Sequence, residues 1–295
     1  MPSDNKKKNS VEYYPSALTI AGSDSGGGAG IEADLRTFNA LGVYGCAAVT
    51  AVTAQNPETI TRIDLLPAAA VTAQIEAAAA KIAIRCVKTG MLGSAENAAA
   101  AAAAVKKHNF KLICDPVMVS TSGKKLLDDE AVEVLKKELF PKAYWLTPNI
   151  PECEFLLGKK LTTDAQIADG AAELADKFAV NILLKGGHNE KSKRAIDYVC
   201  FKGELFTLST PKVKLPPFAG HGTGCTLSAA MAALTALNFS WSDMLQDAKA
   251  FTFGSLRENV EIGEGVSAMY PPVEDSLELV EMERLSAKRT KGPSR

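Results

Sequence analysis

One segment of the chain has the composition of an anion-binding helix start. GHGTGC at 220–225 runs directly into a helix predicted over 224–236. Backbone N–H groups at a helix start point outward, and the helix dipole adds partial positive charge there. Gly222 and Gly224 would let several of these groups converge on one phosphate without a lysine. The alternative is a helix start whose glycines serve only tight packing.

A cysteine in the same segment has two interpretations. Cys225 lies in the first turn of the predicted helix, where the helix field lowers the pKa of a thiol. Such a thiol could act as a base or as a nucleophile. A cysteine beside alanine and serine is also typical of a small buried residue, and the nearby His221 has equally ordinary explanations.

A second glycine-rich loop follows the first predicted strand. GSDSGGGAG at 22–30 comes directly after an apolar run at 17–21. So many glycines allow unusual backbone conformations and let a ligand approach the main chain closely. The loop matches neither G-x-G-x-x-G nor G-x-x-x-x-G-K-[ST], so it supports neither a dinucleotide fold nor a P-loop. A flexible turn is the simpler alternative.

Other predicted strand ends carry residues that suit a metal and a polyphosphate. Asn149 and Glu152 are three positions apart in TPNIPE, so at a helix start both could face one site and hold hydrated Mg²⁺. An N-cap with its capping-box partner explains the same pair equally well. Asp115 in DPVM and Lys185 in LKGGH show the same ambiguity.

The elements that must position these loops alternate between strands and helices. This order predicts a single α/β domain, a three-layer αβα sandwich with a central, mostly parallel sheet. We expect Ser94 to be an N-cap and Gly42 a C-cap. The predicted strands cover 17–21, 46–52, 84–87, 111–114, 144–146 and 181–184, the predicted helices cover 31–41, 68–80, 95–105, 128–139, 164–178, 224–236 and 241–257, and an edge hairpin covers 198–201 and 205–208. The polar loops then gather at the carboxyl edge of the sheet, where open parallel sheets bind ligands.

Composition and charge limit the class of protein. The 295 residues are 46% hydrophobic and 23% charged, with 33 basic and 34 acidic side chains, which is typical of a globular protein and not of a nucleic-acid binder. Six cysteines without a C-x-x-C spacing and three separate histidines predict reduced thiols in a cytoplasmic protein without a zinc site. We expect no signal peptide and no membrane span. Residues 1–15 are predicted to be a flexible segment, 16–272 the domain and 273–295 a C-terminal tail.

Several spaced motifs together resemble one family of kinases. The chain is similar to the bacterial hydroxymethylpyrimidine/phosphomethylpyrimidine kinases of thiamine synthesis, in the ribokinase-like superfamily. The motifs that match in order and spacing are GSDSGGGAGIEADLRTF, TAQNP, KTGML, DPVM, TPNIPE, LKGGH and HGTGCTLSAA. They span about residues 16–272. Motifs that agree with one another are more specific than any one of them, so the resemblance favours the functional interpretation of each loop.

The resemblance implies an activity and a role for each site residue. ATP with Mg²⁺ would phosphorylate the hydroxymethyl group of 4-amino-5-hydroxymethyl-2-methylpyrimidine, and then the monophosphate. Gln55 and Asp34 would bind the amino group and ring nitrogens, since an amide both donates and accepts hydrogen bonds. The pocket for the pyrimidine would be lined by Gly22, Met91 and Met118, and the anion hole would consist of Gly222, Thr223, Gly224 and Cys225, with Cys225 in the position of the base. Asp115 and Lys185 would contact the polyphosphate. Asn149 and Glu152 would support Mg²⁺–ATP, with Glu152 as the metal ligand. A homodimer is expected because relatives form one, with no nucleic-acid or membrane partner.

Some motif residues differ from the common pattern of the superfamily. Sugar kinases of the superfamily generally have aspartate where this chain has Cys225. Phosphoryl transfer depends chiefly on positioning and charge neutralisation, so a thiol could assist a neutral alcohol without repelling the ionised acceptor of the second step. Ser25 and Gly26 differ from the usual first loop, and PPFAG at 216–220 replaces the usual polar approach to His221.

Two other functions stay open at the level of sequence. Some close relatives with the same HGTGC segment phosphorylate pyridoxal, so a vitamin B6 kinase is the alternative activity. A non-catalytic ligand-binding protein on this fold is the other alternative, although such a protein would be expected to have lost the polar loops. The sequence does not decide whether one or two phosphoryl groups are transferred.

Overall fold

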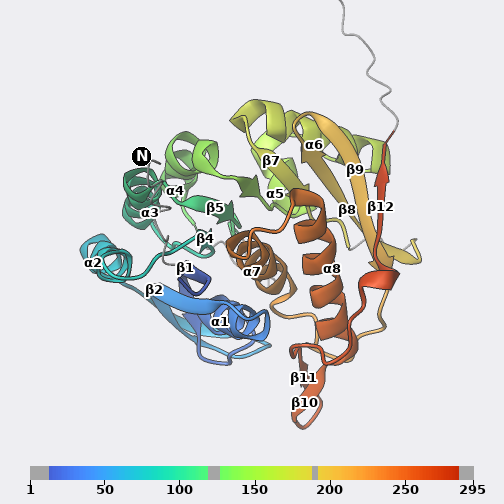
Figure 1. The fold of residues 1–295 in the computed structure, drawn as a ribbon, viewed down its shortest axis with the longest axis horizontal. Helices are drawn as coiled ribbons and strands as arrows, with labels where there is room; N and C mark the ends of the chain where they lie inside the picture. The colour runs from blue at the N-terminus through green and yellow to red at the C-terminus, as the bar shows by residue number, and fades with distance from the viewer. Residues whose placement is uncertain (1–12, 119–126, 188–191, 286–295) are drawn as a thin grey trace, which may run out of the picture.

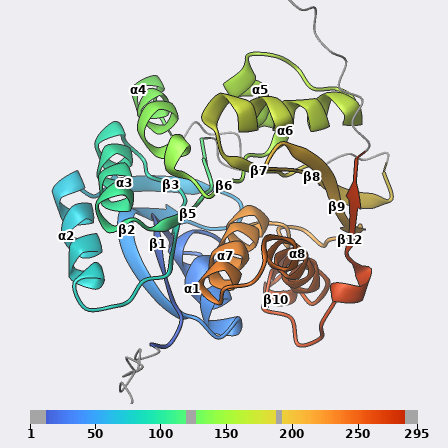
Figure 2. The ribbon, with the colours of Figure 1, turned by 45° about the horizontal axis from the view of Figure 1, so that its top comes forward.

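A ten-stranded sheet lies between two layers of helices (Figure 1, Figure 2). The computed structural model describes residues 13–118, 127–187 and 192–285. The strands of the sheet are β1 (Ser16–Asp24), β2 (Tyr44–Gln55), β3 (Ile60–Leu65), β4 (Cys86–Thr89), β5 (Lys111–Cys114), β6 (Trp145–Leu146), β7 (Asn181–Leu184), β8 (Arg194–Phe201), β9 (Glu204–Pro211) and β12 (Glu281–Arg284). A separate hairpin consists of β10 (Val260–Gly263) and β11 (Val266–Ala268).

Eight α-helices connect or follow these strands within the described residues. They are α1 (Gly30–Ala40), α2 (Ala68–Ala79), α3 (Ala95–His108), α4 (Asp129–Val134), α5 (Ile150–Leu157), α6 (Asp164–Phe178), α7 (Thr223–Ala236) and α8 (Trp241–Arg257). A π-helical turn at Leu135–Leu139 continues α4, and 3₁₀ turns cover Phe140–Lys142 and Leu277–Leu279. No helix in the described ranges is both long enough and apolar enough to span a membrane.

The sheet has the predicted, mostly parallel topology. Its strand order is β12-β9-β8-β7-β6-β5-β4-β1-β2-β3, and the strands from β7 to β2 pair in parallel. The β8–β9 hairpin extends one edge in antiparallel fashion, and β3 closes the other edge. The carboxyl ends of the parallel strands therefore lie along one edge of the sheet.

Each face of the sheet packs on its own apolar core. Alternate side chains of a strand point to opposite faces, so Leu18 and Ile20 of β1 join one core and Ala17 joins the other. Helices α2 to α6 cover the first core, and α1, α7 and α8 cover the second (Figure 2). The three-layer arrangement predicted from the alternation of elements is confirmed.

Local sequence signals explain several helix boundaries. The Ser94 hydroxyl accepts a hydrogen bond from the amide of Asn97, as an N-cap does. Gly42 follows α1 with φ +72°, a left-handed conformation that favours glycine. The predicted N-cap is confirmed, whereas the C-cap of α1 is Leu41 and Gly42 is the residue after it.

The structure also contains elements that the sequence pattern did not predict. The predicted helix at 128–139 is split into α4 and the π turn, and β3 and β12 were missed. Part of the predicted tail belongs to the sheet, because β12 pairs with β9 and its Glu281 forms an ion pair with Arg194. The sequence EMER of β12 contains a single apolar residue and so gives no periodic signal for a strand. It forms a strand because it pairs with β9. Residues 1–12 and 286–295, which the sequence assigned to the flexible segment and the tail, lie outside the described residues.

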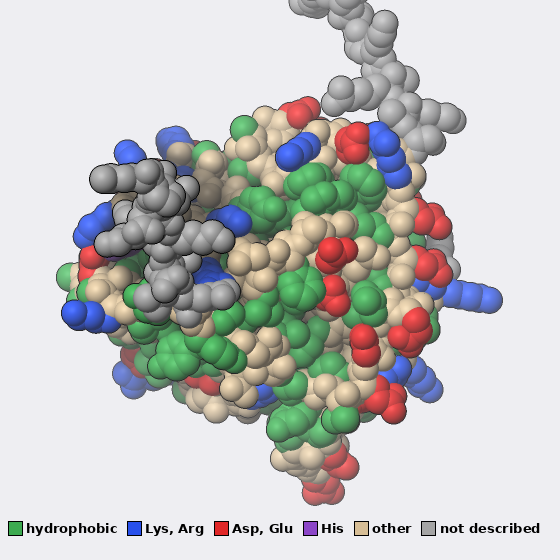
Figure 3. Space-filling model, in the orientation of Figure 1, with side chains coloured by type: hydrophobic (Ala, Val, Ile, Leu, Met, Phe, Trp, Pro, Cys, Tyr) green, Lys and Arg blue, Asp and Glu red, His purple; other side chains and the backbone are tan. Residues whose placement is uncertain are grey.

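Charged side chains are mixed over the face drawn in Figure 3. Acidic and basic groups that the structure describes there alternate with apolar and uncharged ones, in line with the net charge of −1. This face presents no continuous basic surface among its described residues.

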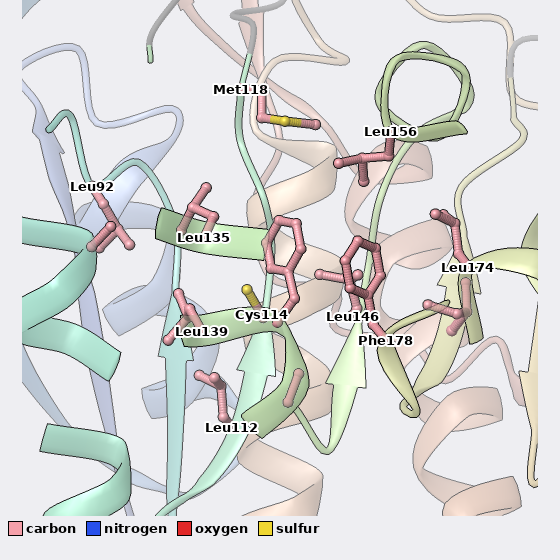
Figure 4. Close-up of a cluster of buried hydrophobic side chains, with 14 of the residues drawn as sticks. Leu92, Leu112, Cys114, Met118, Leu135, Leu139, Leu146, Leu156, Leu174 and Phe178 are labelled. Carbon is pink, nitrogen blue, oxygen red and sulfur yellow. The ribbon is translucent and has the colours of Figure 1, made fainter. Parts of the chain in front are cut away.

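Buried apolar side chains from the sheet and from the helices that cover it form the first core (Figure 4). Leu146 of β6 is 0% exposed and lies in the cluster with Leu112, Leu139 and Phe178. Protein interiors are close-packed, so a truncated side chain there leaves a cavity that the neighbours fill only partly.

Leu146→Ala is expected to lower the free energy of unfolding by about 2–5 kcal/mol, because it removes apolar contacts and opens a cavity. Val273→Ala, at a side chain that is 94% exposed, is the matched control and should change stability by less than about 0.5 kcal/mol. Urea unfolding followed by circular dichroism measures both. Equal losses in the two variants would contradict the packing described here.

Candidate active site

A cavity of about 610 Å³ opens at the carboxyl edge of the parallel strands. The loops that leave these strands line it together with the start of α7, as the topology predicts. The predicted site residues that line the cavity are Gly22, Gln55, Met91, Asp115, Asn149, Glu152, Lys185, Gly222, Thr223, Gly224 and Cys225. Residues far apart in the sequence are thus brought to one place.

The start of α7 presents free amides to this cavity. The amide of Thr226 donates to the carbonyl of Gly222 at 2.8 Å, and that of Thr223 donates to Gly220 at 3.4 Å. Among the described residues, no acceptor takes the amide hydrogens of Gly224 and Cys225. With the positive end of the helix dipole, these two amides form an anion-binding cradle.

Glycine is required at Gly222, and the space at Gly224 is tight. Gly222 has φ +86°, and a Cβ there would lie 1.9 Å from the carbonyl oxygen of Gly28. A Cβ at Gly224 would lie 3.2 Å from Nζ of Lys185. The absence of side chains therefore lets the first loop and Lys185 approach the cradle, so tight packing is part of what these glycines do.

Two acidic groups and one lysine lie beside the cradle. Nζ of Lys185 is 2.9 Å from Oδ1 of Asp115, and Ser228 donates to Oδ2 of the same carboxylate at 3.2 Å. Burial raises the pKa of Glu152, and Asp115 raises it further, while Lys185 opposes the shift. Two carboxyl groups against one ammonium leave this corner of the cavity short of positive charge.

The capping-box explanation of Asn149 and Glu152 is correct. The side chain of Asn149 accepts from the amide of Glu152 at 2.8 Å, and Oε2 of Glu152 accepts from the amide of Asn149 at 2.9 Å. Oε1 of Glu152 also accepts from the amide of Met118 at 3.1 Å. Both carboxylate oxygens still have a lone pair available, because each can accept more than one hydrogen bond.

The residues at this corner fit a hydrated Mg²⁺ bound together with phosphate. Within the described ranges, no group of three or more His, Cys, Asp or Glu side chains could hold a metal by itself. Mg²⁺ usually keeps several waters and binds one or two carboxylates plus substrate phosphates. Asp115 and Glu152 would supply the carboxylates, and the missing positive charge at this corner favours a cation.

Gln55 is the last residue of β2, and Lys185 follows β7. These strands are at the two ends of the parallel part of the sheet, so the two residues lie at opposite ends of the cavity. Gly22 and Met91 line the cavity with it, and a Cβ on Gly22 would lie 3.3 Å from Cε of Met91. Gly22 is part of β1, whose register with β2 shifts between Ala21 and Ser23, so this position is not in a flexible turn. The arrangement places apolar groups from Gly22 and Met91 in the same cavity as the amide of Gln55, which suits a flat heterocycle with polar edges.

Two residues that were predicted to contact the substrate do not line this cavity. Asp34 is 0% exposed, and its carboxylate pairs with Lys88 at 2.8 Å and accepts from Thr19 at 2.6 Å, so it does not line the cavity. The buried face of α1 carries Asp34 into the interior. Met118 is 4% exposed and belongs to the first core (Figure 4).

The pKa of Cys225 is raised, contrary to the expectation from its place in the helix. Burial is the main cause, and the nearby charge of Lys88 only partly opposes it. Asp34 and Asp115 raise the pKa further. Burial thus opposes ionisation of the thiol, which favours its protonated form.

Several cavity residues escaped sequence reasoning. Lys88 lies within KTGML and looked like part of a strand, yet it lines the cavity with its ammonium group paired to Asp34. Lys249 and Asp197 form a second buried pair at 2.7 Å on the wall made by α8 and β8. His221 lines the cavity and contacts Gln55 and Asp24, which its place in HGTGC could have suggested.

The geometry agrees with comparisons to known proteins. A family model for phosphomethylpyrimidine kinase matches residues 24–270. The chain belongs to the phosphomethylpyrimidine kinase family. A hydroxymethylpyrimidine/phosphomethylpyrimidine kinase of Haemophilus influenzae is 42% identical over 252 residues, which are 84% of this chain and 93% of that protein.

Solved structures of this kinase class have the same fold. The phosphomethylpyrimidine kinase of Clostridium difficile 630 is 38% identical with a TM-score of 0.70, and the match covers 81% of this chain and 97% of that one. The pyridoxal kinase of Staphylococcus aureus, in complex with AMP-PCP and pyridoxal, is 30% identical with a TM-score of 0.81, over 92% of this chain and 100% of that one. The predicted ribokinase-like architecture is confirmed.

Lys88→Met is expected to lower the free energy of unfolding by about 3–5 kcal/mol, because it leaves Asp34 buried without its counter-charge. The double variant Lys88→Met/Asp34→Leu removes both charges and should recover most of that loss. Urea unfolding of the wild type, both single variants and the double variant measures the coupling. Additive losses in the double variant would show that the two groups do not stabilise each other.

The raised pKa of Cys225 predicts slow alkylation at neutral pH. Only the thiolate reacts with iodoacetamide, so the rate at Cys225 should rise about tenfold per pH unit and continue to rise above pH 9. Burial raises the pKa of Cys86 and Cys114 to about 12, and these thiols should react more slowly still. Peptide mass spectrometry gives the rates. A rate at Cys225 that levels off below pH 8 would mean that its pKa is lowered.

Proposed function

We propose that this chain transfers the terminal phosphoryl group of ATP, with Mg²⁺, to the hydroxymethyl group of 4-amino-5-hydroxymethyl-2-methylpyrimidine, and then phosphorylates the monophosphate in thiamine biosynthesis. One observation carries the proposal: the free amides of Gly224 and Cys225 and the side-chain amide of Gln55 line the same cavity. Relatives named for this activity, at about 40% identity over most of the chain, support it.

The charges around the cradle suit phosphoryl transfer. The reaction moves a charged group between two oxygens, so the protein contributes mainly by positioning and neutralising charge. The amides of Gly224 and Cys225 would receive the transferring group, and Lys185 beside Asp115 would contact the polyphosphate. Mg²⁺ held at Asp115 and Glu152 would neutralise the phosphates of ATP. The AMP-PCP in the Staphylococcus aureus complex supports ATP as the donor.

The protonated thiol of Cys225 suits an enzyme that accepts two different substrates. In the first step the acceptor is a neutral alcohol, and in the second it is a phosphate that is already ionised. A neutral thiol at the cradle does not repel the ionised acceptor, as a carboxylate would. To assist the first step, Cys225 would take the proton of the alcohol as a thiolate, which its raised pKa makes the minor form at neutral pH.

Phosphorylation of pyridoxal is the second candidate. The Staphylococcus aureus pyridoxal kinase aligns over 92% of this chain with a TM-score of 0.81, higher than the 0.70 of the Clostridium difficile enzyme. Its sequence identity is lower, at 30% against 38%. Fold similarity alone does not decide between two flat heterocycles that carry a hydroxymethyl group, so the pyrimidine is favoured by sequence and by the amide of Gln55.

The homodimer that the family resemblance implies and the cytoplasmic location that the cysteines indicate are part of the same proposal. Size-exclusion chromatography with light scattering would report the oligomeric state of the purified chain. A monomer at micromolar concentration would remove the dimer from the proposal without affecting the chemistry.

Incubation with ATP–Mg²⁺ and the pyrimidine alcohol should yield a species with one added phosphoryl group and then one with two, as seen in a mass-spectrometric time course. Pyridoxal in a parallel incubation should be phosphorylated more slowly. Preference for pyridoxal would support the second candidate, and binding without turnover would support a non-catalytic protein.

Cys225→Ala should slow the first transfer by about 100-fold, the lower range for a lost acid–base group, and the second by less than tenfold. Cys225→Ser, which keeps a hydroxyl at the position, is the matched control and should fall between wild type and alanine. Equal slowing of both transfers would contradict the division of roles proposed for the thiol.

A further inference from the structure

Three segments of the cavity wall meet at the side chain of His221. Its Nε2 lies 3.2 Å from Oδ2 of Asp24, the last residue of β1, and 3.2 Å from the amide nitrogen assigned to Gln55, the last residue of β2. One ring nitrogen cannot donate to a carboxylate and at the same time accept from an amide N–H. One of the two contacts therefore decides the protonation of Nε2.

Asp24 requires a donor from the histidine. Its carboxylate is 3% exposed, and it accepts from the amides of Gly26 and Ala29, each at 2.8 Å. Burial would raise the pKa of Asp24, but the hydrogen bonds from His221, Gly26 and Ala29 outweigh it and hold the pKa below its usual value. An ionised carboxylate only accepts hydrogen bonds, so Nε2 of His221 must carry a hydrogen.

Thr53 determines the orientation of the Gln55 amide from the other side. Its hydroxyl lies 2.8 Å from the carbonyl oxygen of Ser23 and 3.3 Å from the atom assigned as Oε1 of Gln55. A carbonyl only accepts, so the single hydroxyl hydrogen goes to Ser23. Thr53 can then only accept from Gln55, which means that the NH₂ group of the amide faces Thr53.

Both neighbours require the same orientation of the amide. Exchanging the oxygen and nitrogen of Gln55 moves no heavy-atom position and satisfies all the contacts at once. The NH₂ group of Gln55 then donates to Thr53, and its carbonyl oxygen accepts from Nε2–H of His221. The same Nε2–H also donates to the carboxylate of Asp24.

We propose that His221, held as the Nε2–H tautomer by Asp24, is the positioning residue that fixes the donor and acceptor order of the Gln55 amide for the acceptor substrate. This inference rests on the proposed function. The free N–H of Gln55 lies on the Thr53 side and the free lone pair on the His221 side. A 4-aminopyrimidine, with a ring-nitrogen acceptor next to an amino donor, is complementary to that order.

The same side chain connects substrate recognition to the anion cradle. His221 immediately precedes Gly222, and a Cβ at Gly28 would lie 2.6 Å from Cδ2 of the imidazole. The ring is thus packed between the first glycine-rich loop and the start of α7. A substitution at His221 is expected to change the KM for the pyrimidine more than the KM for ATP, because Gln55 lies on the side of the cavity that would bind the acceptor.

The tautomer can be read directly by NMR of the full chain labelled with ¹⁵N-histidine. The protein has three histidines. The ring nitrogen signals that are present in the wild type and absent from the His221→Gln variant therefore belong to His221. We expect Nε2 of His221 to carry hydrogen. An unprotonated Nε2 would overturn the proposal. This readout needs no substrate, so it is independent of whether the pyrimidine is turned over.

Two variants separate positioning from a general structural role. A glutamine side chain can place its amide nitrogen near the position of Nε2, whereas asparagine reaches only that of Nδ1. His221→Gln should keep the KM for the pyrimidine within about threefold, and His221→Asn should raise it about tenfold, the cost of one hydrogen bond, with the KM for ATP unchanged. His108→Asn, on α3 and bonded to Glu76, is the control and should change neither constant.

Equal effects of the two His221 variants on the pyrimidine KM would overturn the positioning role, and so would a parallel rise in the KM for ATP. Failure of the wild type to phosphorylate the pyrimidine would instead refute the proposed function. In that case the protonation of Nε2 still tests the hydrogen-bond network, and the NMR result stands by itself.

Discussion

The close approach of two glycine-rich loops is the constraint on which the rest of the site depends. A side chain at Gly222 would overlap the carbonyl of Gly28, and a Cβ at Gly30 would lie 2.4 Å from the carbonyl of Gly22. Backbone therefore packs on backbone where the first loop meets the start of α7. This contact directs the amides of Gly224 and Cys225 into the cavity, and it brings the imidazole beside the loop that carries the acidic side chain.

Buried charge pairs surround the cavity and define its electrostatics before any ligand binds. The pairs are Lys88–Asp34, Lys185–Asp115 and Lys249–Asp197. Each lysine comes from a different part of the fold, and each forms an ion pair with a carboxylate. Oriented charges of this kind need no rearrangement when a phosphate arrives, which is the main way in which proteins stabilise transferring groups. The cost of burying these groups is met by their pairing and hydrogen bonds.

Sequence predicted the sheet and most of the cavity, because the strand ends of a parallel sheet must lie along one edge. Gln55 was identified through its motif, and the structure brings it to the cavity. Asp34 was not placed correctly, since a motif does not say whether a carboxylate faces a ligand or a buried lysine. Lys88 was missed because a cation inside an apolar strand has no periodic signal. The pKa of Cys225 depends on burial by distant segments, which a local helix argument does not include.

The two outermost strands of the sheet also bear on how the molecule behaves in a crowded solution. An unprotected strand edge is a template for pairing with other chains, and charged side chains on edge strands prevent such association. At one edge, β3 exposes Arg62 and Asp64. At the other, β12 covers β9 and presents Glu283 and Arg284 outward. A form of the chain shortened before β12 would uncover the apolar hairpin edge, so this short charged strand protects the protein against aggregation.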